Sequence, residues 1–454
     1  MPGAGDREAG RRWTWPQLVA LFGFHGALGL AMHQLPPLAT IHSVAAIVAV
    51  LAVSLYAQRP ELLLSGMCYV SGSEVLWRMS KAFVFHETAK YVIVLICIIG
   101  LLRLARPRAP GLMVLYLSLL LPSAVITYYS FGDFNFIRRS WAFALSGPLA
   151  ITAAVCYCSN LRLKAGEVWH AIIALAAPLV GVAAITLVST YWREGVKFTT
   201  ESNFETSGGF GPNQVASALA LGALLIVLGA LLFEQKPGLK AFFIALAAVF
   251  TVQSAMTFSR GGVFAMVFAL ALVSPLLLTS RRQRITLLVS ALVLAVLAPQ
   301  VYAGLNRYTG GKFEKRFADT NMSGREDLLL TDLAVWEQNP VFGVGLGISR
   351  FYHKKGTLAH TEFSRALAES GSLGALAYIV FCLVCAQRAL AILGQGGSIY
   401  RPLLLAAMIW SAMYMLVNAN RTAAPALAMG LAFVTINAPG RAGVAPSARG
   451  VRAA

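Results

Sequence analysis

The sequence is poor in charge, and acidic side chains are the scarcest part of it. Only 12% of the 454 residues are charged, with 19 acidic against 37 basic residues, whereas soluble globular proteins carry about 25% charged residues. Hydrophobic residues make up 57% of the chain. Water is therefore not the main solvent of this protein, and the composition indicates one membrane domain instead of several soluble domains.

Cysteine is also sparse, and all six cysteines lie inside apolar runs. Cys382 and Cys385 have a C-x-x-C spacing, but no histidine or second cysteine pair lies near them. A structural zinc site normally needs four such ligands. We interpret the cysteines as small buried hydrophobic residues, and we expect neither a bound metal nor another cofactor.

Long apolar runs are abundant, and many reach the length that spans a bilayer. They predict an all-α polytopic membrane protein with about 12, and up to 14, transmembrane helices. The run near 61–77 is a doubtful span because Glu74 and Arg78 make it polar. The candidate spans lie near 15–32, 38–57, 61–77, 90–105, 110–128, 141–158, 168–190, 213–233, 239–258, 262–279, 285–303, 372–392, 402–418 and 422–438.

Basic residues in the short loops predict the orientation, because cytoplasmic loops are enriched in Lys and Arg. With the N-terminus inside, the inner segments hold 19 basic residues and the outer short segments 9. Both termini are therefore expected in the cytoplasm, and the net charge of +18 does not indicate nucleic-acid binding. The expected parts are an N-terminal segment (1–14), a transmembrane bundle (15–303), a long outer loop with short helices (304–371), C-terminal transmembrane helices (372–438) and a disordered tail (439–454).

The long loop contains a helix with clear start and stop signals. Ser323 and Glu326 have the spacing of a capping box, in which each side chain satisfies a backbone donor at the helix start. Apolar residues then recur at helical spacing up to Trp336. Asn339-Pro340 should end this helix, since the residue before proline avoids the helical region.

Glycines and charged residues follow in the second half of the loop. Gly343, Gly345 and Gly347 lack the spacing of a dinucleotide-binding loop, so they predict a tight turn or a close approach of the backbone. A second short helix should end at the glycine breaks at Gly371 and Gly374. It is expected to carry His360, Glu362, Arg365 and Glu369.

Cations on the outer segments are the strongest indication of a functional site. Arg193 and Lys197 precede a glycine-rich turn, and Arg260 lies in a very short turn between two apolar runs. An ionisable residue at such a place needs an anionic partner, and the arginine fork suits phosphate. The alternative is that Arg260 only caps helix carbonyls or meets lipid phosphate.

Two other charged groups have a plain structural explanation. Arg365 and Glu369 are i, i+4 neighbours, and an ordinary helix salt bridge is the favoured interpretation. The spacing of Glu74, Arg78, Glu87 and Lys90 likewise permits internal salt bridges, which we favour over a role in function.

Several motifs together resemble the O-antigen ligase and polymerase superfamily. The similarity covers roughly residues 70 to 435 and is sharpest within about 190–375. The matching pieces are Phe210-Gly211-Pro212-Asn213, Ser259-Arg260-Gly261-Gly262, Arg325, Trp336, Asn339-Pro340, Gly343-Val344-Gly345, Ala359-His360-Thr361-Glu362-Phe363 and the segment from Glu369 to Gly374. Many members have asparagine after the histidine where this chain has Thr361.

The resemblance implies a GT-C-like glycosyltransferase of the bacterial inner membrane. A ligase of this kind moves a glycan from undecaprenyl diphosphate to lipid A–core oligosaccharide at the periplasmic face, inverting the linkage without a metal. The diphosphate-binding arginines of the family correspond to Arg193 and Arg260, and its essential loop histidine corresponds to His360. Further candidate substrate-binding residues are Lys197, Asn213, Arg325, Glu362, Arg365, Arg78 and Lys90.

The chemistry of the outer residues agrees with this expectation. Fixed arginines in a partly dehydrated site stabilise a leaving diphosphate, and the outer segments contain no D-x-D pair to hold a divalent ion. His360 is expected to take the proton of the acceptor hydroxyl near pH 7, with Glu362 and Glu369 as alternative bases. Membrane lipids are the other expected partners.

Three other functions remain open at this point. A polysaccharide polymerase and a protein O-oligosaccharyl ligase use the same chemistry on a different acceptor. A lipid-linked glycan transporter is a different class, but it should place polar groups near the bilayer midplane. This chain gathers them at one face, which favours a transferase.

Overall fold

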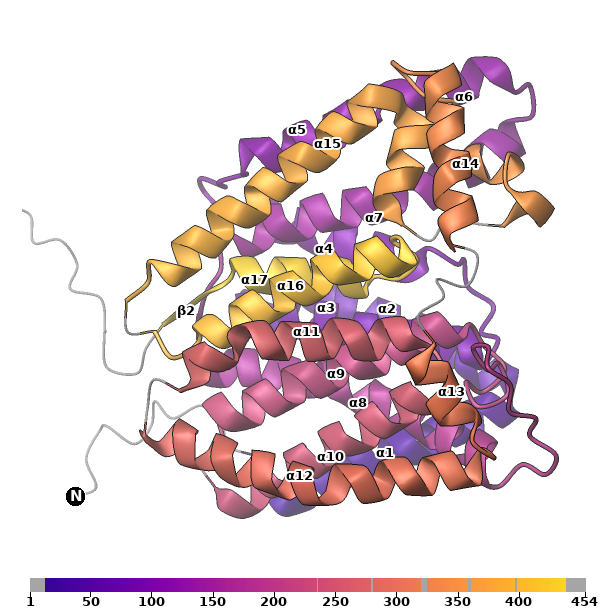
Figure 1. Ribbon diagram of the computed structural model, residues 1–454. Helices are drawn as coiled ribbons and strands as arrows, with labels where there is room; N and C mark the ends of the chain where they lie inside the picture. The colour runs from indigo at the N-terminus through magenta and orange to yellow at the C-terminus, as the bar shows by residue number, and fades with distance from the viewer. Residues whose placement is uncertain are drawn as a thin grey trace, which may run out of the picture.

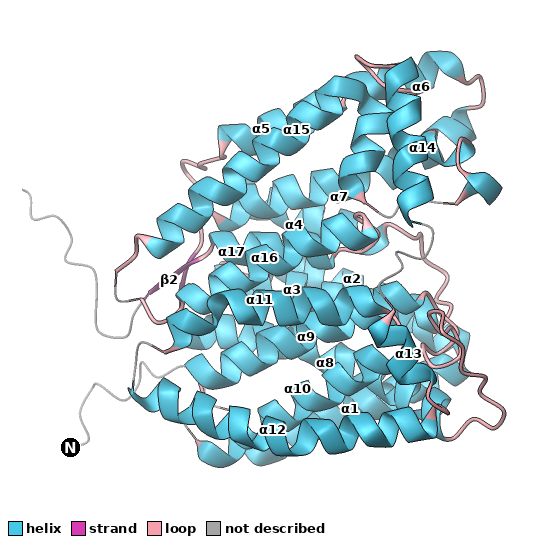
Figure 2. Cartoon of the chain, in the orientation of Figure 1, coloured by secondary structure: helices cyan, strands magenta, loops and turns pink. Residues whose placement is uncertain are grey.

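The computed structural model describes residues 13–234, 236–278, 281–319, 325–357, 361–396 and 398–437. This part of the chain is almost wholly helical (Figures 1 and 2). The helices are α1 (Trp15–Gln34), α2 (Pro36–Tyr56), α3 (Pro60–Met79), α4 (Thr88–Leu102), α5 (Gly111–Leu120), α6 (Pro122–Ser130), α7 (Phe134–Cys158), α8 (Ala165–Tyr191), α9 (Pro212–Leu232), α10 (Pro237–Met256), α11 (Arg260–Leu277), α12 (Arg281–Tyr308), α13 (Lys312–Ala318), α14 (Arg325–Gln338), α15 (Glu362–Leu393), α16 (Arg401–Asn418) and α17 (Ala424–Phe433). Two 3-10 helices, η2 (Ser349–Phe351) and η3 (Lys354–Gly356), and two strands, β1 (Arg162–Lys164) and β2 (Thr435–Asn437), complete it.

The helices confirm the prediction of an all-α polytopic membrane protein. Within the described ranges, 11 helices are long and apolar enough to cross a membrane, and α4 and α17 are shorter apolar helices. Large apolar side chains are exposed along the helices, among them Ile41 at 64%, Leu288 at 68% and Ile379 at 56%. Contact of such side chains with lipid tails is favourable, whereas their exposure to water is unfavourable.

The bundle has two distinct ends. Trp13 packs edge-on against His170 in the first turns of α8, and β1, which leads into α8, pairs in parallel with β2. The first and last described residues therefore lie at one end. At the other end Tyr191, the last residue of α8, contacts Tyr308, the last residue of α12, and α13 follows there (Figure 1). We call this second end the loop end.

The doubtful third span is a buried helix inside the bundle. α3 packs closely on α8, and a Cβ at Gly72 would lie 2.4 Å from the Leu175 carbonyl oxygen. Ser71, Ser73 and Glu74 are 3%, 0% and 2% exposed. The polar residues of α3 thus face other helices and not lipid, so hydropathy alone underrates this helix.

The long loop follows the predicted order of helices. α14 ends at Gln338, directly before Asn339-Pro340, as the sequence predicted. α15 begins at Glu362 and is kinked at Gly371, whose φ of 61° and ψ of −146° are not helical. The expected break therefore lies at Gly371, while Gly374 lies inside the helical segment that follows. Ser323 lies outside the described residues.

The alternating glycines bring the loop onto the start of α15. Gly343 and Gly345 have φ values of 68° and 100°, which side-chain-bearing residues rarely adopt. A Cβ at Gly343 would lie 2.3 Å from the Glu369 carbonyl carbon, and one at Gly345 would lie 2.7 Å from the Thr127 hydroxyl. The backbone N–H of Gly345 donates to the Glu369 carbonyl at 3.0 Å. The prediction of a tight, close-approaching backbone is confirmed.

Gly262 sets how closely α11 approaches α9, and so where α11 begins. A Cβ at this position would lie 2.7 Å from both the carbonyl carbon and the oxygen of Ala216. Both atoms belong to the backbone of α9, which a side-chain rotation cannot relieve.

We therefore expect Gly262→Ala to destabilise the purified protein, by about 1–3 kcal/mol as for other overpacked sites. Thermal unfolding in detergent measures this effect. Gly23→Ala in α1 is the matched control, because nothing lies within 4 Å of the added methyl group. Equal unfolding temperatures for the two variants would contradict the close α9–α11 contact.

Candidate functional site

Arg260 opens α11 at the loop end and is tied to α13. Its guanidinium donates a hydrogen bond to the backbone carbonyl of Asp319, just after α13. Arg316, within α13, donates back to the Phe258 carbonyl at 2.9 Å. Phe258 has a φ of 58°, and its ring contacts that of Phe313 at 6.0 Å. Phe258 is thus a strained residue held by its surroundings, and it fixes the position from which the Arg260 side chain extends.

Asn213, a predicted substrate-binding residue, has a role in this turn. Its side-chain oxygen accepts a hydrogen bond of 2.6 Å from the hydroxyl of Ser259, which precedes Arg260. The Ser259-Arg260 turn and the start of α9 are therefore joined directly. Asn213 positions Arg260 through this bond.

Arg325 lies half-buried among other arginines. Burial lowers its pKa, and the charges of Arg260, Arg316 and Arg421 lower it further. Arg325 makes no hydrogen bond or ion pair with any residue of the described ranges. Three guanidinium groups thus lie within electrostatic reach of Arg325 at the loop end, and no anion of the described ranges forms an ion pair with it. We call Arg260, Arg316, Arg325 and Arg421 the arginine cluster.

Arg316 is the member of the cluster with the clearest structural role. Besides the Phe258 carbonyl, it binds the Thr200 carbonyl at 2.9 Å and lies 3.7 Å from the exposed Glu201 carboxylate. Burial and the charge of Arg260 lower its pKa. Arg316 therefore ties the connection between α8 and α9 to α13.

Glu362, Arg365 and Glu369 form one buried network at the start of α15. Arg365 lies between the two carboxylates, and its Nη1 donates to Glu369 at 2.9 Å. It also donates to Glu362 and to the Ala144 carbonyl. Glu369 in turn accepts from the Ser349 hydroxyl at 2.9 Å. The i, i+4 salt bridge expected from the sequence forms, but it belongs to a larger network that joins α15 to α7 and the loop.

Arg78 and Lys90 also lie in buried polar surroundings. Arg78 donates to Glu74 at 2.5 Å, to the Gln214 side chain at 2.7 Å and to the Arg421 carbonyl at 3.0 Å. Lys90 is 2% exposed and donates to the Ser146 hydroxyl at 3.2 Å. The internal salt bridge favoured from the sequence is present for Glu74 and Arg78.

Arg193 and Lys197 lie on the α8–α9 connection, and both side chains are exposed. The Lys197 backbone is fixed by the Glu205 carboxylate and the Asn203 amide. Among the described residues, neither basic side chain makes a hydrogen bond or ion pair with the arginine cluster. His360, the predicted base, lies outside the described residues.

Sequence reasoning did not single out Arg316 or Arg421 as site residues. In the sequence, Arg316 lies in a basic stretch at the start of the long loop, and Arg421 is an isolated basic residue in a short turn between apolar runs. No motif contains them. Only the fold brings α13 and the α16–α17 turn beside Arg260 and Arg325.

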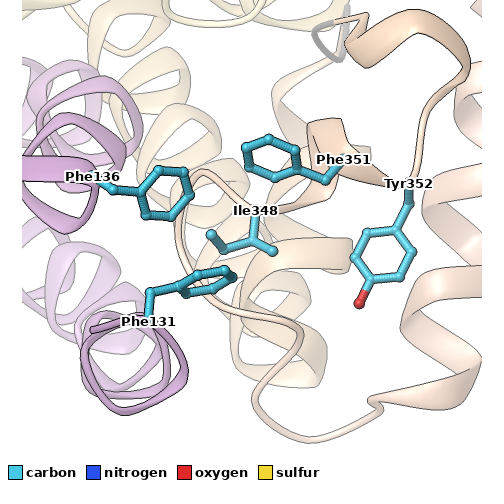
Figure 3. Close-up of a pocket in the computed structure, with 5 residues that line it drawn as sticks. All are labelled: Phe131, Phe136, Ile348, Phe351 and Tyr352. Atoms are coloured by element: carbon cyan, nitrogen blue, oxygen red, sulfur yellow. The ribbon is translucent and has the colours of Figure 1, made fainter. Parts of the chain in front are cut away.

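An apolar cavity of about 300 Å³ lies beside the loop (Figure 3). It is lined by Phe131, Phe136, Ile348, Phe351 and Tyr352. None of these side chains carries a charge, and none belongs to the arginine cluster. The cavity is therefore no candidate for holding a diphosphate.

A buried histidine–carboxylate pair supports the same stretch of loop. His353 Nε2 lies 2.8 Å from Asp332 in α14, and both side chains are 0% exposed. The other ring nitrogen lies 2.7 Å from the Thr357 carbonyl. Because both nitrogens face acceptors, both must carry protons to donate. Burial disfavours this charge, but the hydrogen bonds to Asp332 and Thr357 outweigh it and raise the pKa of His353.

The raised pKa predicts a pH-dependent stability. The contribution of His353 should be complete below its ordinary pKa of about 6.5 and should fall as the pH rises through the higher folded value. His353→Gln or Asp332→Asn should cost about 3–5 kcal/mol at pH 6, as for other broken buried pairs, and less at high pH. Thermal unfolding against pH measures this, with the exposed Lys354→Ala as control. A pH-independent cost would contradict the ion pair.

Comparison with known protein families finds one similar family. Residues 254–379 match the family described as O-antigen ligase. No curated protein matches the chain. The matched segment includes Arg260, Arg316 and Arg325 and the start of α15, and it ends before Arg421. This match confirms the resemblance to the O-antigen ligase and polymerase superfamily over residues 254–379.

Proposed function

We propose that the protein is an O-antigen ligase of the bacterial inner membrane. It transfers a glycan from undecaprenyl diphosphate to lipid A–core oligosaccharide at the periplasmic face, inverting the sugar linkage without a metal. The arginine cluster carries this proposal, because Arg325 lies half-buried among three other cations and makes no ion pair in the described ranges. A diphosphate supplies the negative charge that such a cluster requires.

The reaction places new negative charge where the cluster lies. The acceptor hydroxyl attacks the anomeric carbon from the side opposite the diphosphate, and a new C–O bond forms. The bond between that carbon and the phosphate oxygen breaks, and its electron pair remains on the leaving diphosphate. Fixed guanidinium groups in a partly dehydrated site stabilise this charge without reorganising. Arg260 and Arg325 are the members that we assign to this role.

Arg193 supplies a further guanidinium in this proposal. It lies on the α8–α9 connection, which Arg316 anchors beside the cluster through the Thr200 carbonyl. Its exposed side chain can meet a donor that arrives from the membrane surface. The exposed side chain of Lys197, on the same connection, can also contact the incoming donor.

The acceptor hydroxyl must lose its proton as it attacks. We assign His360 as the base, since a neutral imidazole accepts a proton near pH 7. Glu362 and Glu369, the alternatives, already accept hydrogen bonds from Arg365. Arg365 therefore serves to hold these two carboxylates, and the imidazole remains the favoured base.

Arg260→Ala and Arg325→Ala should each lower the rate of glycan transfer by about 10²–10³-fold, the usual cost of removing one electrostatic donor. His360→Ala should abolish transfer. The assay is transfer by purified protein in detergent, with Arg139→Ala as the charge-matched control because Arg139 is an exposed residue of α7. Normal transfer by all three site variants, each folded as judged by its unfolding temperature, would refute the catalytic assignment.

The acceptor separates the ligase from its alternatives. Purified protein is incubated with the lipid-linked glycan, with and without lipid A–core. A ligase forms product only when lipid A–core is present. Lengthening of the glycan in its absence would identify a polymerase, and the proposed acceptor would then be wrong.

A further inference from the structure

The turn between α16 and α17 is held by two buried carboxylates. Glu362 accepts a hydrogen bond from the Asn420 backbone N–H at 3.0 Å, and Glu74 accepts one from the Ala423 N–H at 2.6 Å. These carboxylates come from α15 and α3, which are distant in sequence. Arg78 adds a bond of 3.0 Å to the Arg421 carbonyl. The backbone on both sides of Arg421 is thus fixed by three side chains from two elements, α15 and α3.

The same turn contains an unfavourable backbone conformation. Ala419 has a φ of 50° and a ψ of −174°, a region that is essentially restricted to glycine. Such strain costs about 1–3 kcal/mol and persists only where the surroundings over-determine it. The bonds from Glu362, Glu74 and Arg78 are those surroundings. The protein therefore tolerates strain in order to place the residues that follow Ala419.

Asn420 adds an independent observation. Its side chain is 7% exposed, and neither its amide oxygen nor its amide nitrogen has a hydrogen-bond partner in the described part of the chain. Buried polar atoms are nearly always paired, and an exception requires an explanation such as a bound molecule. An unpaired amide thus lies next to Arg421 on the strained turn.

The turn lies beside the other arginines. A Cβ at Gly261 would lie 3.4 Å from Val417 and 3.7 Å from the Asn418 amide, so the start of α11 packs on the end of α16. Arg260 is thus adjacent to the residues that lead into the turn. Arg421 also acts electrostatically on Arg325.

Arg421 itself sits in surroundings that disfavour its charge. Burial lowers its pKa, and although Tyr414 and Glu362 counter this effect, Arg365 adds repulsion. The Glu362 carboxylate is already shared between Arg365 and the Asn420 backbone. A bound anion would lower this cost further.

We propose that Arg421, presented by the carboxylate-held turn of residues 419–423, binds the diphosphate of the lipid-linked donor together with Arg260 and Arg325. This inference rests on the proposed function and adds a residue that lies outside the segment matched to the family. A glycosyl diphosphate carries two negative charges, and the leaving diphosphate gains a third when the bond to the sugar breaks. A further guanidinium at this place stabilises the additional charge.

Binding of the product lipid tests the role of Arg421 directly. The probes are undecaprenyl diphosphate and undecaprenyl monophosphate, titrated against purified protein in detergent. Arg421→Ala should weaken diphosphate binding about 10- to 100-fold, the range expected for a lost charge-assisted contact. It should weaken monophosphate binding much less, because the monophosphate carries less charge. Arg421→Lys, which keeps the charge but not the fork, should fall between Arg421→Ala and the wild type.

Matched variants exclude a merely structural effect. Arg139→Ala removes an exposed cation of α7 and should leave both affinities unchanged. A misfolded Arg421→Ala would lose both lipids equally and would lower the unfolding temperature, and the Arg421→Lys variant would then decide. An unchanged preference for diphosphate over monophosphate in Arg421→Lys and Arg421→Ala would overturn the inference.

The outcome also separates this inference from the proposed function. If Arg260→Ala loses diphosphate binding while Arg421→Ala binds as the wild type does, the ligase proposal stands and the role of Arg421 is refuted. If the wild type does not bind undecaprenyl diphosphate, the proposed donor is wrong and the inference fails with it.

Discussion

The site depends on one constraint, the electrostatic repulsion between guanidinium groups. The fold gathers these groups at the loop end. Arg260, Arg316 and Arg421 each lie within electrostatic reach of Arg325, and burial lowers the pKa of Arg316, Arg325 and Arg421. Like charges in a poorly solvated place are costly. Packing holds each arginine in place despite the unfavourable free energy. Binding of an anion with several negative charges would reduce the repulsion between the arginines.

Buried carboxylates organise this end of the bundle without neutralising it. Glu362 and Glu369 are occupied by Arg365, and Glu74 is occupied by Arg78. Glu74 and Glu362 also accept hydrogen bonds from the backbone of the α16–α17 turn. These buried carboxylates of the protein are therefore used for positioning. This division of roles explains how a chain with 19 acidic residues keeps its site cationic.

Contacts of the long loop with α14 and α15 also hold the site in place. The glycines from Gly343 to Gly347 let the backbone bond to the end of the first helical segment of α15, and the His353–Asp332 pair ties the same stretch to α14. The kink at Gly371 then changes the direction of α15. These contacts place the start of α15, with Thr361 and Glu362, beside α7 and the α16–α17 turn.

The sequence by itself determined the membrane fold class, the order of most helices, the end of α14 before Asn339-Pro340, the break at Gly371 and the superfamily. These features follow from local signals, namely apolar length, residues that end helices and short motifs. The sequence left α3 as a doubtful span, although it is a buried helix of the bundle. Hydropathy cannot distinguish polar residues that face protein from those that face lipid. Motifs identified Arg260 and Arg325 as candidate site residues, but they did not identify the arginines that lie beside them. Only the tertiary structure decided that Arg316 and Arg421 join them and that Glu74 and Glu362 hold one turn. The physical reason is that electrostatic contact depends on separation in space, and Glu74 is 349 positions from Ala423, whose backbone it holds.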